Sequence, residues 1–253
     1  MGQGVFITGT DTGVGKTLVT AGIVRWLRNQ GIDAVPMKPV QTGGERRSEA
    51  RGDRLVSPDL KFALAAADLQ PDHAEMKLMS PYVYLPACSP HLAGRMAKRY
   101  MEPSVVRNCA NGLLRGHQAV IVEGAGGIMV PINESDTMLD LMKILAYPVV
   151  LVSRVSLGTI NHTLLSIHAL RVSGVSLIGV VFNQMEQSST ENRFIEEDNP
   201  GTVARFGKVP VLGKIMHFDP ESKTEETWRD FEKSMTGLPD IRDALGCDTN
   251  ESA

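Results

Sequence analysis

The stretch from Val5 to Thr17, VFITGTDTGVGKT, decides the fold of this chain. Its first residues, Val5–Thr8, are apolar, which predicts a buried strand, and a helix is predicted from Lys16 to Asn29. A glycine-rich turn between a strand and a helix offers backbone N–H groups that can wrap a phosphate chain. In such a loop, a lysine like Lys16 bridges phosphate oxygens, and a hydroxyl like that of Thr17 binds Mg²⁺.

The alternative is a purely structural glycine-rich turn followed by a surface lysine. The position between a strand and a helix disfavours that alternative. The spacing departs from the usual P-loop in one respect, because Thr10 stands where the first glycine is expected and Gly9 lies one residue earlier. The sequence therefore predicts a variant P-loop that is one residue longer between its glycines.

Strand-like and helix-like segments alternate along most of the chain, which predicts a mainly parallel sheet with right-handed crossovers. Four further strands are predicted at Ala34–Lys38, Ala119–Val122, Val149–Val152 and Leu177–Phe182. The other predicted helices are Leu60–Ala67, Pro90–Arg99, Pro103–Arg115, Met138–Leu145, Thr159–Val172 and Glu191–Phe206. The expected fold is one α/β domain of the P-loop NTPase type, residues 1–236, with helices on both faces of the sheet. Residues 237–253 are expected to form a weakly patterned, mobile tail, and Glu45–Arg54 a solvated loop.

The composition excludes several classes of protein. The 253 residues carry a net charge of −3, which argues against a nucleic-acid coat and a polybasic membrane anchor. The three cysteines lie far apart without CxxC spacing, so neither a disulfide framework nor a zinc knuckle is expected. We expect no signal peptide and no transmembrane helix, since no apolar run reaches about 18 residues. A cytoplasmic protein that binds neither nucleic acid nor membranes is the expectation.

Two polar motifs follow predicted strands, at the sheet edge where ligands bind in parallel α/β folds. Lys38 opens KPVQTG and would bring an ammonium group near the phosphates, and Thr42 is available to a substrate. A strand-edge lysine can also simply extend into solvent, so this motif alone is ambiguous. Glu123 opens EGAGG after another apolar strand, where P-loop proteins typically place a carboxylate, more often Asp, that holds Mg²⁺ or its waters.

Three other candidate site residues each have two interpretations when only the sequence is considered. Asp59 opens a predicted helix, where a carboxylate commonly caps, and Asp53 has a similar spacing from Lys38. Asn161 also lies at the start of a predicted helix. It either caps that helix or lies beside free backbone N–H groups that bind an anion. Asn183 ends the fifth strand, and it either hydrogen-bonds a purine edge or caps a turn.

Six segments, in this order along the chain, resemble the dethiobiotin synthetase family of biotin synthesis. They are GTDTGVGKT (9–17), KPVQTG (38–43), YLPACSPHLA (84–93), VEGAGGIMVPI (122–132), LGTINHTLL (157–165) and VVFNQ (180–184). The P-loop alone is unspecific, whereas KPVQTG, VEGAGG and LGTINH together are quite specific. The likeness covers roughly Val5 to Phe218.

The resemblance implies an ATP-dependent ring closure on 7,8-diaminononanoate, a vicinal diamine on a fatty-acid-like chain. CO₂ and one amine would give a carbamate, which ATP would phosphorylate to a carbamic–phosphoric anhydride. Attack by the other amine would then form the cyclic ureido group, ADP and phosphate. This chemistry requires positioning and charge neutralisation rather than a protein nucleophile. The resemblance implies Mg²⁺ as cofactor and ATP as co-substrate.

The resemblance also implies roles for individual residues. The ATP site would comprise Gly13, Val14, Gly15, Lys16, Thr17, Leu18, Glu123, Gly124, Ala125, Gly126, Asn183, Met216, His217 and Phe218. Lys38 would be the catalytic lysine, and Thr42 would contact the substrate. Mg²⁺ would be surrounded by Thr17, Asp59 and Glu123. The chain departs from the family at Met216, where members often have proline, and at Gly13, where some have glutamate.

A homodimer with shared active sites is implied as well. The diamine end of the substrate would lie at the P-loop of one subunit. Its carboxylate would be held by the helix start Thr159, Ile160 and Asn161 of the other subunit.

Three alternatives share the fold. A nucleotide-switch ATPase acting on protein partners often carries a second lysine, as in KGGVGKT, and this chain has Thr10 and Asp11 there. A non-catalytic regulatory domain would not need Lys16, Lys38 and Glu123. An amidating cobyrinate synthetase would need a glutamine-amidotransferase domain, for which the sequence after Gly213 leaves no room.

Overall fold

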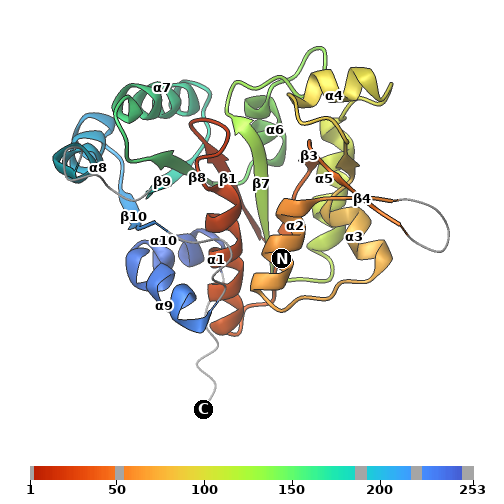
Figure 1. Ribbon diagram of the computed structural model, residues 1–253, viewed down its shortest axis with the longest axis horizontal. Helices are drawn as coiled ribbons and strands as arrows, with labels where there is room; N and C mark the ends of the chain where they lie inside the picture. The colour runs from red at the N-terminus through yellow and green to blue at the C-terminus, as the bar shows by residue number, and fades with distance from the viewer. Residues whose placement is uncertain (1–2, 49–53, 186–192, 218–223, 247–253) are drawn as a thin grey trace.

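A computed structural model describes residues 3–48, 54–185, 193–217 and 224–246. Its centre is a six-stranded parallel sheet with the order β10–β9–β8–β1–β7–β2 (Figure 1). The strands are β1 (Gln3–Gly9), β2 (Ala34–Met37), β7 (Ala119–Gly127), β8 (Val149–Arg154), β9 (Leu177–Asn183) and β10 (Val211–Ile215). The α/β fold and the five predicted strands are confirmed. The sequence pattern misses β10, because Gly213 and Lys214 interrupt its apolar run.

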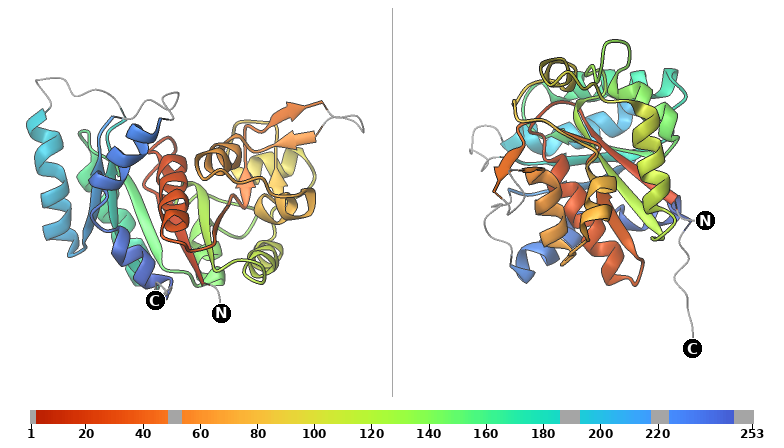
Figure 2. Two further views of the ribbon diagram at one scale, coloured as in Figure 1. Left: turned by 90° about the horizontal axis from the view of Figure 1, so that it is seen from below. Right: turned by 90° about the vertical axis from the view of Figure 1, so that its right-hand side faces the viewer.

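Helices cover both faces of this sheet (Figure 2). One face is covered by α1 (Lys16–Asn29), α9 (Glu225–Ser234) and α10 (Leu238–Ala244). The other face is covered by α5 (Pro103–Leu113), α6 (Met138–Leu145), α7 (Thr159–Val172) and α8 (Arg193–Gly207). Among the described residues, no helix has the length and apolarity that crossing a membrane requires.

The smaller elements lie beyond the β2 edge of the sheet, on the right of Figure 1. They are α2 (Pro58–Ala66), α3 (His73–Met79), α4 (Pro90–Met96) and the strand pairs β3 (Val40–Gln41) with β6 (Tyr82–Val83) and β4 (Glu45–Arg47) with β5 (Arg54–Val56). The β4–β5 hairpin corrects the expectation of a solvated loop at residues 45–54. Its side chains are exposed in β4 and half-buried in β5, so the sequence has no apolar run that predicts this hairpin.

Alternation along β1 divides the core into two layers. Val5 and Ile7 pack into the cluster that contains α1, whereas Phe6 packs on the opposite face with α5 and α6. All three side chains are fully buried. A strand buried on both faces reads as a continuous apolar run, which is why the sequence predicted it correctly.

Residues after Gly237 differ from the expected tail. Helix α10 begins at Leu238, and the side chains of Leu238, Ile241 and Leu245 are buried in the same cluster as α1. Residues 247–253 lie outside the described part of the chain. The packed domain therefore extends at least to residue 245.

The parallel register brings the polar motifs together. The carboxyl ends of all six strands lie at one edge, and β1 stands between β7 and β8. Ile7 pairs with Glu123 across β1 and β7. Met37, the last residue of β2, pairs with Val122, so Lys38 follows β2 beside Glu123 of β7. The loop after β1, Lys38 after β2 and Glu123 in β7 thus share one edge of the sheet.

We predict that Gly22→Ala destabilises the protein. A Cβ atom at Gly22, in the middle of α1, would overlap the ring of Phe231 in α9, which is 2% exposed. Overpacking of this kind costs about 1–3 kcal/mol, and the better helix propensity of alanine offsets only about 0.5–1 kcal/mol. Urea unfolding measures the change.

The matched control is Gly201→Ala in α8, where no atom lies within 4 Å of the added Cβ. It should leave stability unchanged or raise it by up to about 1 kcal/mol. Equal stability of the two variants would contradict the docking of α9 on α1.

Candidate active site

The loop between β1 and α1 has the geometry of a phosphate-binding loop. Gly13 and Gly15 adopt left-handed backbone angles, with φ of 71° and 97°. A Cβ atom at Gly15 would also overlap the side-chain amide of Asn183, which donates a hydrogen bond to the Val14 carbonyl over 3.2 Å. Asn183 at the end of β9 therefore packs directly against the loop, and glycine is required at position 15.

Lys16 lies inside the site rather than on the surface. It is 6% exposed, and its Nζ donates to the backbone carbonyl of Asp11 over 2.8 Å. Burial, followed by repulsion from Lys38, lowers the pKa of Lys16 to about 8, although Glu123 and Asp59 oppose the shift. A buried cation poised beside the loop carbonyls is available to phosphate oxygens.

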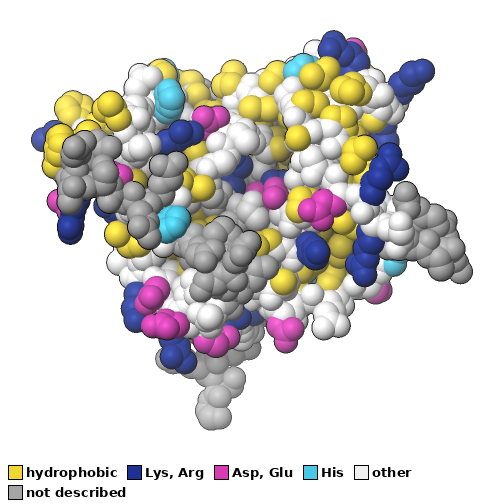
Figure 3. Space-filling model, viewed as in Figure 1, with side chains coloured by type: hydrophobic (Ala, Val, Ile, Leu, Met, Phe, Trp, Pro, Cys, Tyr) yellow, Lys and Arg dark blue, Asp and Glu magenta, His cyan; other side chains and the backbone are white. Residues whose placement is uncertain are grey.

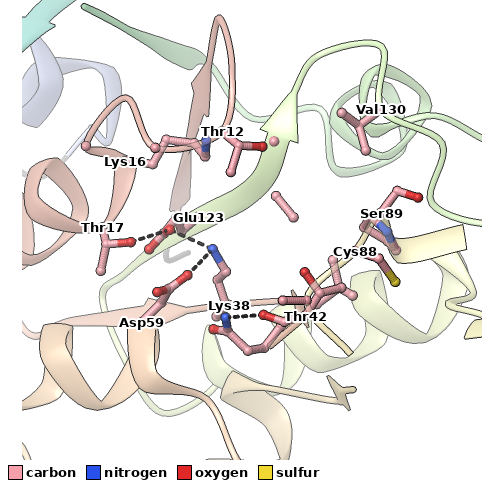
Figure 4. Close-up of a pocket in the computed structure, with 18 of the residues that line it drawn as sticks. Thr12, Lys16, Thr17, Lys38, Thr42, Asp59, Cys88, Ser89, Glu123 and Val130 are labelled. Carbon is pink, nitrogen blue, oxygen red and sulfur yellow. Dashed lines mark hydrogen bonds and ion pairs between the residues drawn. The ribbon is translucent and has the colours of Figure 1, made fainter. Parts of the chain in front are cut away.

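The centre of the site is a cluster of two carboxylates, one ammonium group and one hydroxyl (Figure 4). Lys38 Nζ lies 2.6 Å from Glu123 Oε1 and 2.7 Å from Asp59 Oδ2, and it also donates to the Gly124 carbonyl over 3.2 Å. Thr17 Oγ1 donates to the same Glu123 oxygen over 2.8 Å. The structure thus joins residues from α1, α2, β7 and the position after β2 in one hydrogen-bonded group.

Burial and the neighbouring charges together set the protonation of this cluster. Burial alone would lower the pKa of Lys38, but Glu123 and Asp59 outweigh it and raise that pKa above its usual value. Burial also raises the pKa of Glu123, and Asp59 adds to the rise, while Lys38 and Thr17 oppose it. Both groups hold their protons more tightly than in water, so Lys38 remains a cation at neutral pH.

A cavity of about 660 Å³ opens in front of this cluster. Figure 3 shows it as a hollow near the middle of the face, where acidic and basic side chains meet. Thr42, which the resemblance assigns to the substrate, and Ala125 and Gly126, which it assigns to ATP, line it. Ala87, Cys88, Ser89 and Pro90 also line it. They belong to the YLPACSPHLA motif, in which no site residue was predicted although the motif supported the resemblance.

A second cavity of about 330 Å³ lies on the other side of Asp59 and Thr17. Leu18, Phe62, Asn183, Met185 and His217 are among its walls. Asn183 Oδ1 is buried and has no hydrogen-bond partner among the described residues, so a polar acceptor is available there. Apolar walls with one free acceptor suit a purine base. Phe62 and Met185 were not predicted, and the position of Phe62 three residues after Asp59 on α2 is the only signal for it.

Six described residues implied by the resemblance line neither of these cavities. Two of them, Val14 and Gly124, lie behind the cavity walls, and their carbonyls accept hydrogen bonds from Asn183 and Lys38. Thr159, Ile160 and Asn161 at the start of α7 line neither of the two, and the Thr159 hydroxyl donates to the Arg154 carbonyl over 2.6 Å. Met216 is 58% exposed and lines neither cavity. Phe218, like Asp53, lies outside the described residues.

The donor set fits a magnesium ion. The described residues contain no group of three or more His, Cys, Asp or Glu side chains arranged for a metal. Mg²⁺ is usually bound by one or two carboxylates together with waters and substrate phosphates. Glu123, Asp59 and the Thr17 hydroxyl supply that kind of oxygen set beside the P-loop. These residues would favour neither a soft metal nor a metal that is bound by protein side chains alone.

Solved structures share this fold. The septum site-determining protein MinD of Pyrococcus horikoshii, complexed with Mg-ADP, aligns with a TM-score of 0.63 at 15% identity, over 100% of both chains. A ParA family ATPase from Chlorobium tepidum aligns with a TM-score of 0.52 at 12% identity, over 98% of this chain and 95% of that one. Together with the loop geometry, this likeness defines a P-loop NTPase fold.

Sequence relatives define the family within that class. A family model described as an AAA domain matches residues 3–222. ATP-dependent dethiobiotin synthetase BioD of Halalkalibacterium halodurans is 36% identical, over 87% of this chain and 86% of the relative. The protein of the same name from Anoxybacillus flavithermus is 35% identical, over 90% and 97%. The chain belongs to the dethiobiotin synthetase family and is an ATP-dependent ligase.

We predict that nucleotide affinity falls as the pH rises above about 8. Lys16 has a lowered pKa of about 8 in the free protein, so above that pH it must first take up a proton to bind phosphate as a cation. Each further pH unit should weaken ADP binding by up to about tenfold. Titration calorimetry from about pH 7 to about pH 10 measures the effect.

The control for this pH series is Lys16→Met, which cannot titrate. It should bind ADP more weakly than the wild type at neutral pH, by roughly 10–150-fold, and its affinity should stay flat over the same range. An equally steep fall in the variant would assign the pH dependence to another group.

Proposed function

We propose that this chain closes the ureido ring of dethiobiotin on 7,8-diaminononanoate, using CO₂, ATP and Mg²⁺. One observation carries the proposal: the Lys38 ammonium group lies between Glu123 and Asp59, next to the P-loop and on the wall of the large cavity. A cation at that place can act on both an anionic acceptor and the phosphoryl group that it receives. Membership of the ligase family supports this assignment.

The proposed chemistry has three steps. One amine attacks the carbon of CO₂ and loses a proton, which gives a carbamate. A carbamate oxygen attacks the γ-phosphorus of ATP, and ADP leaves, which gives a carbamic–phosphoric anhydride. The second amine attacks the carbonyl carbon of this anhydride, phosphate leaves, and the five-membered ring closes.

The residues of the chain position and neutralise charge in this scheme. Lys16 would bind the phosphate chain of ATP, while Lys38 would stabilise the carbamate and the phosphoryl group in transfer. Thr42, on the wall of the large cavity, would contact the diamine. Asn183 and His217, on the wall of the smaller cavity, would contact the adenine.

Mg²⁺ would be held by Thr17, Asp59 and Glu123 together with phosphate oxygens. When bound, it neutralises negative charge on the β- and γ-phosphates. Asp59 is better suited than Glu123 to exchange ligands, since its side chain is 30% exposed and that of Glu123 is 3% exposed. Glu123 would act chiefly as the fixed acceptor that orients Lys38 and Thr17.

The reaction is tested directly with the purified protein, diaminononanoate, bicarbonate, Mg²⁺ and ATP, by mass spectrometry for the ureido product. We predict that Lys38→Met lowers turnover by about 10²–10³-fold while changing ATP affinity much less, because Lys38 acts mainly on charge that develops during transfer. Calorimetry with ATP checks that the variant is folded and binds. Absence of ureido product from the wild type would refute the proposed reaction, and a Lys38→Met protein that loses only ATP affinity would refute the role of Lys38.

We also propose that the protein works as a homodimer with shared sites. The start of α7 has no side-chain cap, and the first N–H groups of a helix, here those of Ile160 and Asn161, have no partner within the helix. It lines neither cavity of its own subunit. A partner subunit that places Asn161 near the open end of the large cavity would supply the missing carboxylate site.

We predict that mixing two inactive variants, Lys16→Ala and Asn161→Asp, restores activity. Asn161 is exposed, so aspartate there should fold and yet repel the substrate carboxylate. A mixed dimer holds one site with neither lesion, and random exchange should recover up to about a quarter of wild-type activity. Subunit exchange shown by mass spectrometry without recovered activity, or a fully active monomer by light scattering, would rule out shared sites.

A further inference from the structure

Arg154 reaches the P-loop from the neighbouring strand, although it lines neither of the two cavities. It is the last residue of β8, which pairs with β1 at the ligand edge of the sheet. Its Nη2 donates to Asp11 Oδ2 over 2.9 Å. Asp11 lies in the outer arm of the loop, the segment Thr10–Thr12 that precedes the first left-handed glycine.

Asp11 connects this arginine to the phosphate-binding residues through two further contacts. Its second carboxylate oxygen accepts the backbone N–H of Thr12 over 2.7 Å, which sets the turn of the arm. Its backbone carbonyl accepts the Lys16 ammonium group over 2.8 Å. Displacement of Asp11 would therefore move both Thr12, on the wall of the large cavity, and the acceptor that holds Lys16.

Arg154 is itself held in place. Its backbone carbonyl accepts the Thr159 hydroxyl over 2.6 Å, and Ser153 Oγ lies 2.7 Å from the hydroxyls of both Thr159 and Thr163. On the other side, the Thr10 backbone N–H donates to Val152 over 3.0 Å. Hydrogen bonds thus hold the end of β8 in place, and the outer arm of the loop is hydrogen-bonded to it.

The ion pair contributes little to stability, because the Arg154 and Asp11 side chains are 40% and 54% exposed. Its consequence is geometric. We propose that Arg154 is a positioning residue for the nucleotide site, which fixes Asp11 and, through the Asp11 carbonyl, the place of the Lys16 ammonium group. This inference concerns nucleotide binding alone and does not depend on the acceptor substrate.

The test is a double-mutant cycle on ADP affinity, with Arg154→Met, Asp11→Asn and both together. Asp11→Asn keeps an oxygen for the Thr12 N–H and removes the charge that Arg154 binds. Each single change should weaken ADP binding roughly 3- to 10-fold, and the double change should cost no more than either alone. Arg154→Lys should recover part of the loss, because it restores the charge without the planar guanidinium.

Arg242→Met is the matched control, because Arg242 in α10 also forms one ion pair, with Asp243 over 3.3 Å. It should leave ADP affinity unchanged, and the unfolding temperatures of both arginine variants should match the wild type within a few degrees. In the Lys16→Met background, Arg154→Met should have little further effect.

Two results would overturn the proposal. Unchanged ADP affinity in Arg154→Met would show that the outer arm of the loop keeps its position without Arg154. A full loss that persists in the Asp11→Asn or Lys16→Met background would show that Arg154 acts on the nucleotide directly or through another route.

Discussion

An ammonium group buried between two carboxylates is the constraint on which the active site depends. Lys38 and Glu123 are almost completely buried, and a buried charge is tolerated only with close partners. Removing one partner of such a pair typically costs about 3–5 kcal/mol. The pair therefore ties the ends of β2 and β7 together at the ligand edge, and Asp59 brings the start of α2 to the same point.

This arrangement is possible because the sheet is parallel and has a particular order. β7 lies between β1 and β2, so the strand that carries Glu123 stands between the P-loop strand and the strand that leads to Lys38. β8 flanks β1 on its other side and delivers Arg154 to the outer arm of the loop. The P-loop, Lys38, Glu123 and Arg154 are far apart in sequence, and they meet because each lies at the edge of the sheet where the carboxyl ends of the parallel strands gather.

The P-loop is held at both of its ends by side chains from other strands. Asn183 at the end of β9 packs against Val14 and Gly15, and Arg154 at the end of β8 holds Asp11. A loop with two left-handed glycines has many accessible conformations when it is free, so these contacts reduce the entropy that a nucleotide must remove on binding. The structure thus explains how a loop one residue longer than usual can still present an ordered set of donors.

Local patterns in the sequence determined the P-loop, the five central strands and the approximate bounds of seven helices. Continuous apolar runs and the glycine-rich turn encode these features over a few residues. Lys38 and Glu123 were predicted because a polar residue directly after an apolar strand marks the ligand edge. Tertiary structure decided which distant residues meet. It forms the ion pairs of Asp59 with Lys38 and of Arg154 with Asp11. It also places residues 87–90 in the wall of the large cavity and packs α9 and α10 into the core. These contacts join segments separated by tens to hundreds of residues, and they follow from strand order and helix packing, which no local pattern specifies.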